Sequence, residues 1–324
     1  MKAAIIKERG KAPVYGDFRE PTAAEGQALI HVSASALSQF AKSRSSGSHY
    51  SSRGAFPSVA GVDGVGRTTN GRNVYFALPE APFGALGEIS LVEASRCIPI
   101  PEDVDDVTAA AIANPGMSAW AALMERARLQ PGETVLVNGA TGTAGRLAVQ
   151  LAKHLGAGKV IGTGRNAGEL AELNGFGADN VIPFSLEAGN SAGAAQYEDA
   201  LVEEFERGID VVIDYLWGET AKTVIVAIAK GVEDGHPVRF VHVGGASGEG
   251  NVALPGAALR SSAIQLMGSG AKSVPFPKLL AAVGSVFDAV GPAKLKIATK
   301  TVPLSAVEEY WSAPGKPRIV FTMK

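Results

Sequence analysis

The sequence predicts an α/β protein of two domains, one rich in β-strands and one built on a doubly wound parallel sheet. The chain has 324 residues, and a typical domain has roughly 150. Short strands with frequent turns fill the chain to about residue 115, whereas strands and helices alternate from residue 133 onward. A strand, a glycine-rich turn and a helix follow one another at residues 134–155, the order that a dinucleotide-binding fold requires.

The composition excludes several classes of protein. Lys and Arg number 30 and Asp and Glu 32, giving a net charge of −2, so we expect no nucleic-acid partner, which would need a clustered basic face. No apolar run reaches about 18 residues, so we expect no membrane span. The single cysteine, Cys97, can form neither an internal disulfide nor a Cys-rich zinc site. A reducing compartment is the simplest interpretation, and we expect a cytoplasmic protein.

The first part of the chain has the pattern of a small barrel-like β domain. Residues 27–33 alternate between apolar and polar side chains, as in a half-buried strand. Residues 59–67 carry glycines at a spacing suited to a tightly bent strand. Further strands are predicted at 72–76 and 88–92, and the serine-rich residues 38–53 predict loops and a short helix.

The chain changes character at Asp106. Residues 107–123 are alanine-rich and helical in composition, with an interruption at 114–116. The strands predicted after this point are 134–137, 160–163, 180–183, 211–214, 239–243 and 263–267. The helices predicted between them are 146–155, 167–174, 196–207 and 220–230. This alternation indicates a parallel, doubly wound sheet.

The last part of the chain returns to short elements. We predict a helix at 278–290, a strand at 296–302, a short helix at 305–312 and a final strand at 318–323. Residues 188–195, which precede one of the helices of the sheet domain, have the composition of a flexible surface loop.

The most informative motif is the turn after the first strand of the alternating region. Its pattern is Ala140-x-Gly142-x-x-Gly145, and a helix follows near Arg146. Such a turn is tight, lets the backbone approach a pyrophosphate, and brings helix and strand close together. The N–H groups of the helix then face the anion. We therefore expect cofactor contacts from Asn138, Ala140, Gly142, Thr143, Ala144 and Gly145.

The end of the next strand indicates which cofactor is bound. An NAD site usually has an acidic residue about 20 residues beyond the motif, to bind the ribose 2′-hydroxyl. Counting from Gly145 gives Arg165, and no acid lies between Lys159 and Gly168. An arginine suits a 2′-phosphate, so Gly164 and Arg165 predict NADPH.

The order of these motifs resembles the medium-chain dehydrogenase/reductase superfamily, and within it the zinc-free quinone oxidoreductases that include zeta-crystallin. The resemblance covers nearly the whole chain. The segments that carry it are 25–30, 36–38, 61–66, 115–120, 129–137, 177–179, 210–214 and 244–245. No segment is decisive by itself, but their joint order is specific.

The resemblance implies a GroES-like catalytic domain built from both chain ends. We expect it to comprise residues 1–116 and 268–324, with a Rossmann-type dinucleotide-binding domain inserted at 117–267. Zinc-dependent relatives have a cysteine where this chain has Ser38, and a histidine where it has Val62. Valine cannot bind a metal and serine is a poor zinc ligand. The resemblance therefore implies an enzyme without zinc.

The implied activity is transfer of a hydride from NADPH to a small quinone or α,β-unsaturated carbonyl substrate. Such acceptors spread the developing charge over a conjugated system, which suits a site without a metal. The candidate catalytic residues are Tyr50, in a segment that resembles a loop of the family, and Ser38, where the family usually has asparagine. Ser118 matches a residue that lies beside the nicotinamide. Further cofactor contacts are expected from Tyr215, Gly244 and Gly245.

Two alternatives remain open at this point. The chain could reduce aldehydes or ketones with the same cofactor, or it could bind NADPH without turnover, as a sensor or structural protein. A homodimer is expected in each case, partly from the resemblance. The apolar strand 263–267 lies near the end of the parallel sheet, and an exposed edge of that kind favours pairing.

Overall fold

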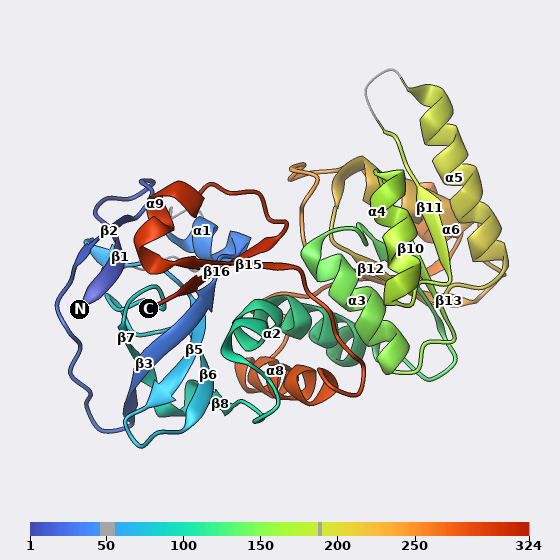
Figure 1. Cartoon of the computed structure of the whole chain (residues 1–324). Coiled ribbons are helices and arrows are strands. Elements are labelled where there is room, and N and C mark those ends of the chain that lie inside the picture. Colours follow the sequence, from blue (N-terminus) through green and yellow to red (C-terminus); the bar gives the residue numbers. More distant parts are fainter. Residues whose placement is uncertain (46–55, 187–189, 324) are drawn as a thin grey trace. The chain divides into compact units, whose positions relative to one another are not determined.

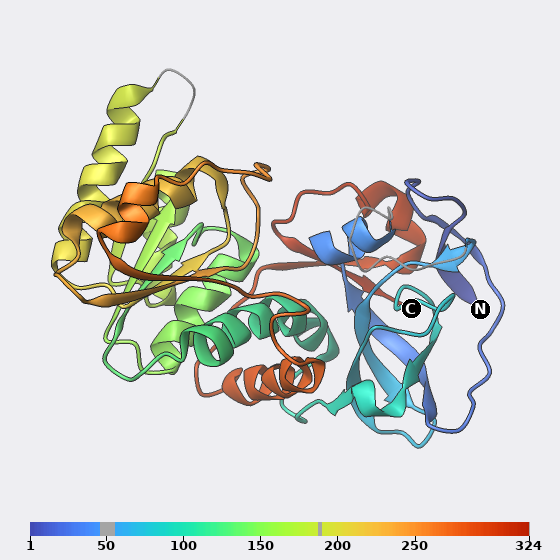
Figure 2. The ribbon, with the colours of Figure 1, turned by 180° about the vertical axis from the view of Figure 1, so that it is seen from behind.

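The computed structural model describes residues 1–45, 56–186 and 190–323, which form two compact units (Figures 1 and 2). The β-rich unit comprises Met1–Asn114, Val283–Gly291 and Ile297–Lys324. The parallel-sheet unit comprises Pro115–Ala282 and Pro292–Lys296. The chain therefore returns to the first unit inside a helix, and not at residue 268 as the sequence suggested.

The β-rich unit holds two sheets, in which most neighbouring strands are antiparallel. In the larger sheet the order is β15-β16-β3-β5-β6-β8, with β7 paired to β3; in the smaller it is β2-β1-β4. The strands are β1 (Lys2–Ile6), β2 (Val14–Asp17), β3 (Gln27–Ala36), β4 (Ser58–Val59), β5 (Asp63–Thr68), β6 (Asn73–Ala77), β7 (Ile89–Glu93), β8 (Cys97–Pro99), β15 (Thr299–Pro303) and β16 (Arg318–Thr322). The β15–β16 pair is parallel, and it joins β3 through β16. The two chain ends therefore share one sheet.

The helices of the β-rich unit are short, apart from two that it shares with the other unit. They are α1 (Gln39–Ser45), η1 (Ala94–Arg96), η4 (Leu304–Ala306) and α9 (Val307–Tyr310). The shared helices are α2 (Asp106–Trp120) and α8 (Phe276–Ala289). Helix α2 runs through Pro115 without the interruption predicted there. The first half of α8 belongs to the parallel-sheet unit because Leu279 and Val274 pack on Ala121.

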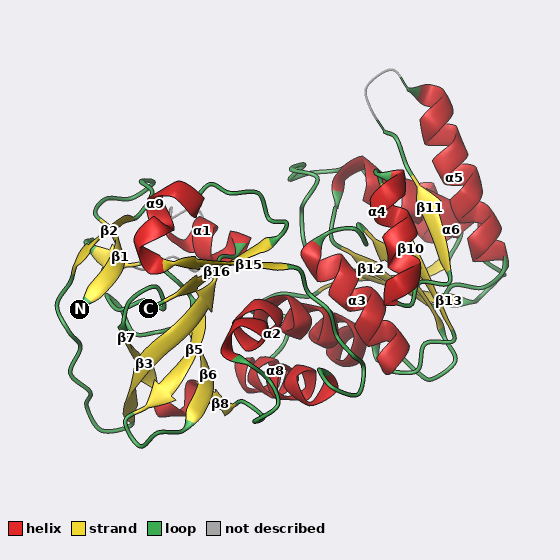
Figure 3. Cartoon of the chain, viewed as in Figure 1, coloured by secondary structure: helices red, strands yellow, loops and turns green. Residues whose placement is uncertain are grey.

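The parallel-sheet unit contains a six-stranded sheet with the order β11-β10-β9-β12-β13-β14 within its described residues. Figure 3 shows strands of this sheet in yellow among helices in red. The strands of the sheet are β9 (Thr134–Asn138), β10 (Lys159–Gly164), β11 (Asn180–Pro183), β12 (Val211–Asp214), β13 (Pro237–His242) and β14 (Ala263–Gly268). Every neighbouring pair is parallel. The six strands predicted for this region are confirmed, and so is the two-domain α/β fold.

Helices cover both faces of this sheet. They are η2 (Ala121–Ala127), α3 (Thr143–His154), α4 (Ala167–Glu172), η3 (Leu173–Phe176), α5 (Ser191–Glu206), α6 (Gly218–Gly231) and α7 (Gly256–Arg260). Helices α3 and α4 lie on one face (Figure 1). Helices α5 and α6 bury the other face, where alternate strand residues such as Leu136, Val212 and Phe240 join one apolar core. Right-handed crossovers require this arrangement, because the strand order reverses direction between β11 and β12.

The reversal sets the place of a ligand. Neighbouring strands β9 and β12 lead to helices on opposite faces, α3 and α6. A crevice opens outside the carboxyl ends of parallel strands at such a switch point, and dinucleotides bind there.

The prediction of a loop at residues 188–195 was wrong for residues 191–195, which begin helix α5. Asn190 caps this helix by accepting a hydrogen bond from the Gly193 N–H (3.0 Å).

Candidate cofactor-binding site

The glycine-rich turn after β9 has a shape that only glycine permits at two positions. Gly139 has a φ of +85°, in the left-handed region that other residues rarely adopt. A Cβ on Gly145 would collide with the Gly139 carbonyl oxygen and lie 2.7 Å from the Ala140 Cα. The missing side chains therefore let the start of α3 press against the end of β9.

The third glycine has a different role. A Cβ on Gly142 would lie no closer than 3.6 Å to another atom, so packing alone does not require glycine there. Gly142 is the residue before α3 and gives the helix no side-chain cap. The first backbone N–H groups of an α-helix have no partner within the helix and point along its axis. Open space beside the start of α3 therefore suits a phosphate.

The end of β10 offers one unengaged cation. Arg165 is exposed, and it makes no hydrogen bond or ion pair with the residues that the structure describes. Arg146, in the first turn of α3, is already engaged: it pairs with Glu172 (2.7 Å) and lies over the ring of Phe176 (5.4 Å). Arg165 is therefore the better candidate for a 2′-phosphate.

Gly164 is buried, and its environment constrains any substitution. A Cβ there would lie 2.6 Å from Cγ2 of Thr141 and 3.1 Å from Cδ2 of Leu170. An acidic side chain at this position would have to displace the phosphate-binding turn before it could reach a ribose. The glycine therefore lets the turn pack close to β10.

A buried polar network joins the carboxyl ends of four strands. The Asn138 amide donates to Asp214 Oδ1 (2.8 Å), and its oxygen accepts from the hydroxyls of Thr163 (2.7 Å) and Tyr197 (3.2 Å). Asp214 in turn contacts Nδ1 of His242 (2.9 Å). Asn138, Thr163 and Asp214 have no exposed surface. The Asn138 side chain can therefore support a cofactor only indirectly.

Sequence reasoning did not single out this network, apart from Asn138. A usable signal was present, because the polar residues stand at or next to the ends of otherwise apolar parallel strands. Alternation along each strand places Thr163, Asp214 and His242 on the face that α5 and α6 cover, since Ile161, Val212 and Phe240 two residues earlier belong to that core.

Four other predicted cofactor residues lie near one another at this edge. Tyr215 follows β12 and is buried, and burial raises the pKa of its hydroxyl, while nearby Ser118 opposes the rise. That hydroxyl has no hydrogen-bond partner among the described residues. A Cβ on Gly244 would lie 3.4 Å from the Tyr215 carbonyl oxygen, and Gly245 borders open space. The structure therefore brings Ser118, Tyr215 and this glycine pair together.

The predicted catalytic residues belong to the β-rich unit, and only one of them is described. Ser38 is buried, and its hydroxyl oxygen accepts a hydrogen bond from the Ala41 N–H (3.0 Å), so it caps helix α1. The Ser38 hydroxyl donates to no described residue, which leaves that donor available. Tyr50 lies outside the described residues.

Asp63, in the glycine-rich bend, belongs to a buried charged cluster. Its carboxylate accepts a hydrogen bond from the Tyr75 hydroxyl (3.1 Å). Burial raises the pKa of Asp63 to about 6, and Arg318 limits the rise. Arg318 is itself buried, and its Nε and Nη2 have no hydrogen-bond partner among the described residues.

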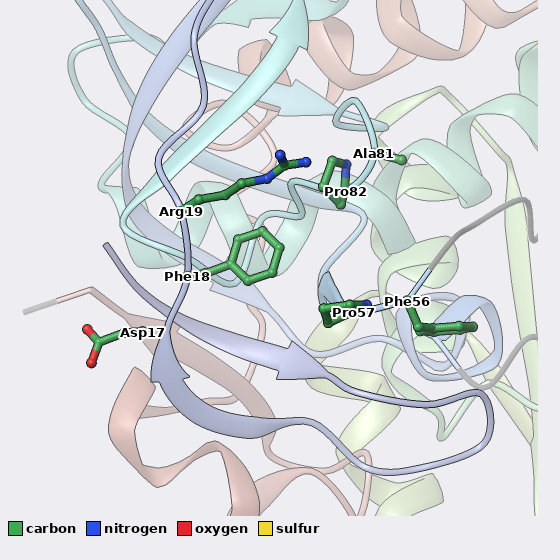
Figure 4. Close-up of a pocket in the computed structure, with 7 residues that line it drawn as sticks. All are labelled: Asp17, Phe18, Arg19, Phe56, Pro57, Ala81 and Pro82. Atoms are coloured by element: carbon green, nitrogen blue, oxygen red, sulfur yellow. The ribbon is translucent and has the colours of Figure 1, made fainter.

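A separate pocket of about 550 Å³ opens on the β-rich unit (Figure 4). Three chain segments line it, and the lining residues are Asp17, Phe18, Arg19, Phe56, Pro57, Ala81 and Pro82. The Arg19 guanidinium lies over the ring of Phe83 (5.6 Å). None of the predicted site residues lines this pocket, so it is not the candidate site.

Among the described residues, no group of three or more His, Cys, Asp and Glu side chains is arranged to hold a metal ion. No described helix has both the length and the apolar character that a membrane-spanning segment needs.

Comparisons with known proteins support the fold and the motif order. A family model described as zinc-binding dehydrogenase matches residues 144–285. A probable NADPH-dependent quinone reductase of Emericella nidulans is 25% identical, with 96% of each chain covered. A probable quinone oxidoreductase of Leishmania amazonensis is 30% identical over 51% of this chain and 49% of its own length. The solved quinone oxidoreductase of Thermus thermophilus, whose study includes an NADPH complex, has a TM-score of 0.81 at 23% identity, with both chains fully covered.

The β-rich unit formed from both chain ends, with a dinucleotide-binding fold inserted, is the architecture expected of a medium-chain dehydrogenase/reductase. The comparisons support that superfamily, and within it the chain is similar to quinone oxidoreductases.

Proposed function

We propose that the protein is an NADPH-dependent oxidoreductase that transfers a hydride to a quinone or an α,β-unsaturated carbonyl compound, without zinc. The observation that carries the proposal is the phosphate-binding turn, closed by Gly145 and followed by the uncapped helix α3, with Arg165 unengaged at the end of β10. The Emericella nidulans relative, described as NADPH-dependent, and the NADPH complex of the Thermus thermophilus enzyme support it.

The residues of the parallel-sheet unit fit this cofactor. The N–H groups at the start of α3 would hold the pyrophosphate, and Arg165 would bind the 2′-phosphate. Ser118, Tyr215, Gly244 and Gly245 would surround the nicotinamide half. Bound NADPH would supply the hydride, and the protein would orient it and exclude water.

The acceptor needs one proton for each hydride. We assign Ser38 as a hydrogen-bond donor to the acceptor oxygen, because its hydroxyl proton has no acceptor among the described residues. Tyr50 stays a predicted proton donor. Zinc-independence rests on residue identity: Ser38 and Val62 occupy positions where zinc-dependent relatives have ligands, and the valine side chain has no donor atom.

A substrate panel tests the proposal. Purified protein is mixed with NADPH and a set of quinones, enones and aldehydes, and NADPH consumption is followed together with the reduced product. Turnover with quinones or enones supports the proposal. Turnover with aldehydes alone would indicate a carbonyl reductase, and tight NADPH binding without any consumption would indicate a sensor or structural protein.

We also propose that the protein forms a homodimer through β14. This strand pairs only with β13 among the described residues, which leaves its other edge unpaired. Leu266 on this strand and Leu259 on α7 are among the large apolar side chains that stay exposed, at 42% and 41%. An unpaired apolar edge favours pairing with a second copy.

A further inference from the structure

We propose that His242, held in place by Asp214, binds the nicotinamide-ribose half of NADPH by accepting a hydrogen bond from a ribose hydroxyl. The proposal rests on the function proposed above. It gives a binding role to His242, which lies outside the glycine-rich turn and apart from Arg165.

The polar network reaches the surface at His242. Asn138, Thr163 and Asp214 are fully buried, whereas 36% of the His242 side chain is exposed. Nδ1 of its ring faces inward to Asp214 (2.9 Å). Nε2 has no hydrogen-bond partner among the residues that the structure describes, so it is available to a ligand.

Asp214 determines which ring nitrogen carries the proton. Its carboxylate already accepts hydrogen bonds from the Asn138 amide (2.8 Å) and from the backbone N–H groups of Leu216 (3.1 Å) and Trp217 (3.1 Å). A carboxylate can only accept, so Nδ1 of His242 must be the donor between them. In the neutral ring Nε2 then holds a lone pair, which suits a hydroxyl donor.

The ring is also fixed from the side. The Trp217 ring packs against the His242 ring, with centroids 4.5 Å apart and ring planes inclined by 43°. The Trp217 backbone has φ +61° and ψ −163°, a region used almost only by glycine, and such conformations persist where the surroundings enforce them. The hydrogen bonds from the Trp217 N–H to both oxygens of Asp214 (3.2 and 3.1 Å) enforce it. The imidazole is therefore held ready before any ligand arrives.

Sheet order places His242 at the nicotinamide half. Arg165 follows β10 and the phosphate turn follows β9, while His242 ends β13, beyond β12 on the other side of the switch point. A dinucleotide extends across the switch point with its halves on opposite sides. With the 2′-phosphate at Arg165, the nicotinamide ribose lies over β12 and β13.

Two ligands separate this contact from the rest of the site. NADPH spans both halves, whereas 2′,5′-ADP carries only the adenosine half with the 2′-phosphate. Both are titrated by calorimetry into the wild type, His242→Asn and His242→Gln, and thermal melting checks folding. The asparagine variant keeps an N–H donor to Asp214 but removes the atom in the Nε2 position. The glutamine variant places an amide near that position.

We expect His242→Asn to weaken NADPH binding about three- to tenfold, as for one lost hydrogen bond, with 2′,5′-ADP binding unchanged. We expect His242→Gln to bind NADPH more tightly than His242→Asn. Unchanged NADPH binding by the asparagine variant, or an equal loss for both ligands, would overturn the proposal. As a test independent of variant folding, NADPH but not 2′,5′-ADP should shift the His242 ring signals in NMR spectra of the wild type. A wild type that binds neither ligand would contradict the proposed function instead.

Discussion

Replacing Arg165 with alanine tests the cofactor assignment directly. Arg165 is exposed at the end of β10 and is engaged with none of the described residues. No existing ion pair has to break when it meets a 2′-phosphate, so the full interaction contributes to binding. NADH lacks the 2′-phosphate, and its binding should change little in Arg165→Ala.

The size of the effect follows from exposure. Charge-assisted hydrogen bonds contribute roughly 1.5–3 kcal/mol each, and an arginine can offer a phosphate two parallel bonds. Because Arg165 is open to water, we count only one such bond at the lower end of that range, about 1.5 kcal/mol. About 1.4 kcal/mol corresponds to a tenfold change in affinity. Arg165→Ala should therefore weaken NADPH binding by about tenfold or more.

The assay is titration of NADPH and NADH into the wild type, Arg165→Ala and two control variants. Arg165→Lys keeps the charge but loses the two-pronged geometry, so its NADPH affinity should fall between the wild type and Arg165→Ala. Arg146→Ala breaks the pair with Glu172 and should leave the NADPH-to-NADH preference unchanged. Equal losses for both cofactors in Arg165→Ala would refute the assignment of Arg165 to the 2′-phosphate.

Four further predictions follow from particular positions. Gly145→Ala should lower the melting temperature and weaken the binding of both NADPH and NADH, because its Cβ would lie 2.7 Å from the Ala140 Cα. In Gly142→Ala the new Cβ would have no atom closer than 3.6 Å. This variant should keep the wild-type melting temperature and weaken only cofactor binding. Burial raises the pKa of Asp63 from 3.8 to about 6, so the folded chain holds the carboxyl proton of Asp63 more tightly than the unfolded chain does. Ionisation of Asp63 therefore lowers the stability of the fold as the pH rises through this range of pKa values. Asp63→Asn should therefore raise the free energy of unfolding by about 2–3 kcal/mol at pH 7 and by little at pH 4, and denaturant titrations showing an equal gain at both pH values would contradict this. Chelators should not change turnover, and elemental analysis should find no stoichiometric zinc; one tightly bound zinc per chain would refute the zinc-independent site. Light scattering at micromolar concentration should report a dimer, which Leu266→Lys should weaken; a wild type that is monomeric would contradict pairing through β14.

Local patterns predicted most of the parallel-sheet unit. Each strand there is a short apolar run, and helical stretches separate most of them, so every strand from β9 to β14 was found from the sequence. The β-rich unit was harder, because β1, β2 and β8 are short and have no long alternating pattern. Their strand character comes from pairing with distant segments, as β1 does with β2 and β4.

The sequence likewise predicted the local parts of the candidate site but not the contacts between distant segments. The turn from Ala140 to Gly145 is contiguous, so its spacing was visible in the sequence. The environment of Gly164 was not visible, because Thr141 and Leu170 approach it only in the folded sheet. The pairing of Asp214 with His242 likewise depends on two strands lying side by side.

The buried network explains how the phosphate-binding turn keeps its shape. The Gly139 N–H donates to the Thr163 hydroxyl (3.1 Å), and the Ala140 N–H donates to the Thr163 carbonyl (2.9 Å). The Thr163 hydroxyl in turn donates to Asn138, which donates to Asp214. Burying an ionised carboxylate is costly unless its hydrogen bonds are satisfied, and here the bonds that satisfy Asp214 also fix both walls of the crevice. A turn already held in its binding conformation loses less entropy when a ligand binds. The polar strand ends therefore support the proposed cofactor site from below, although most of them are too deeply buried to contact a cofactor.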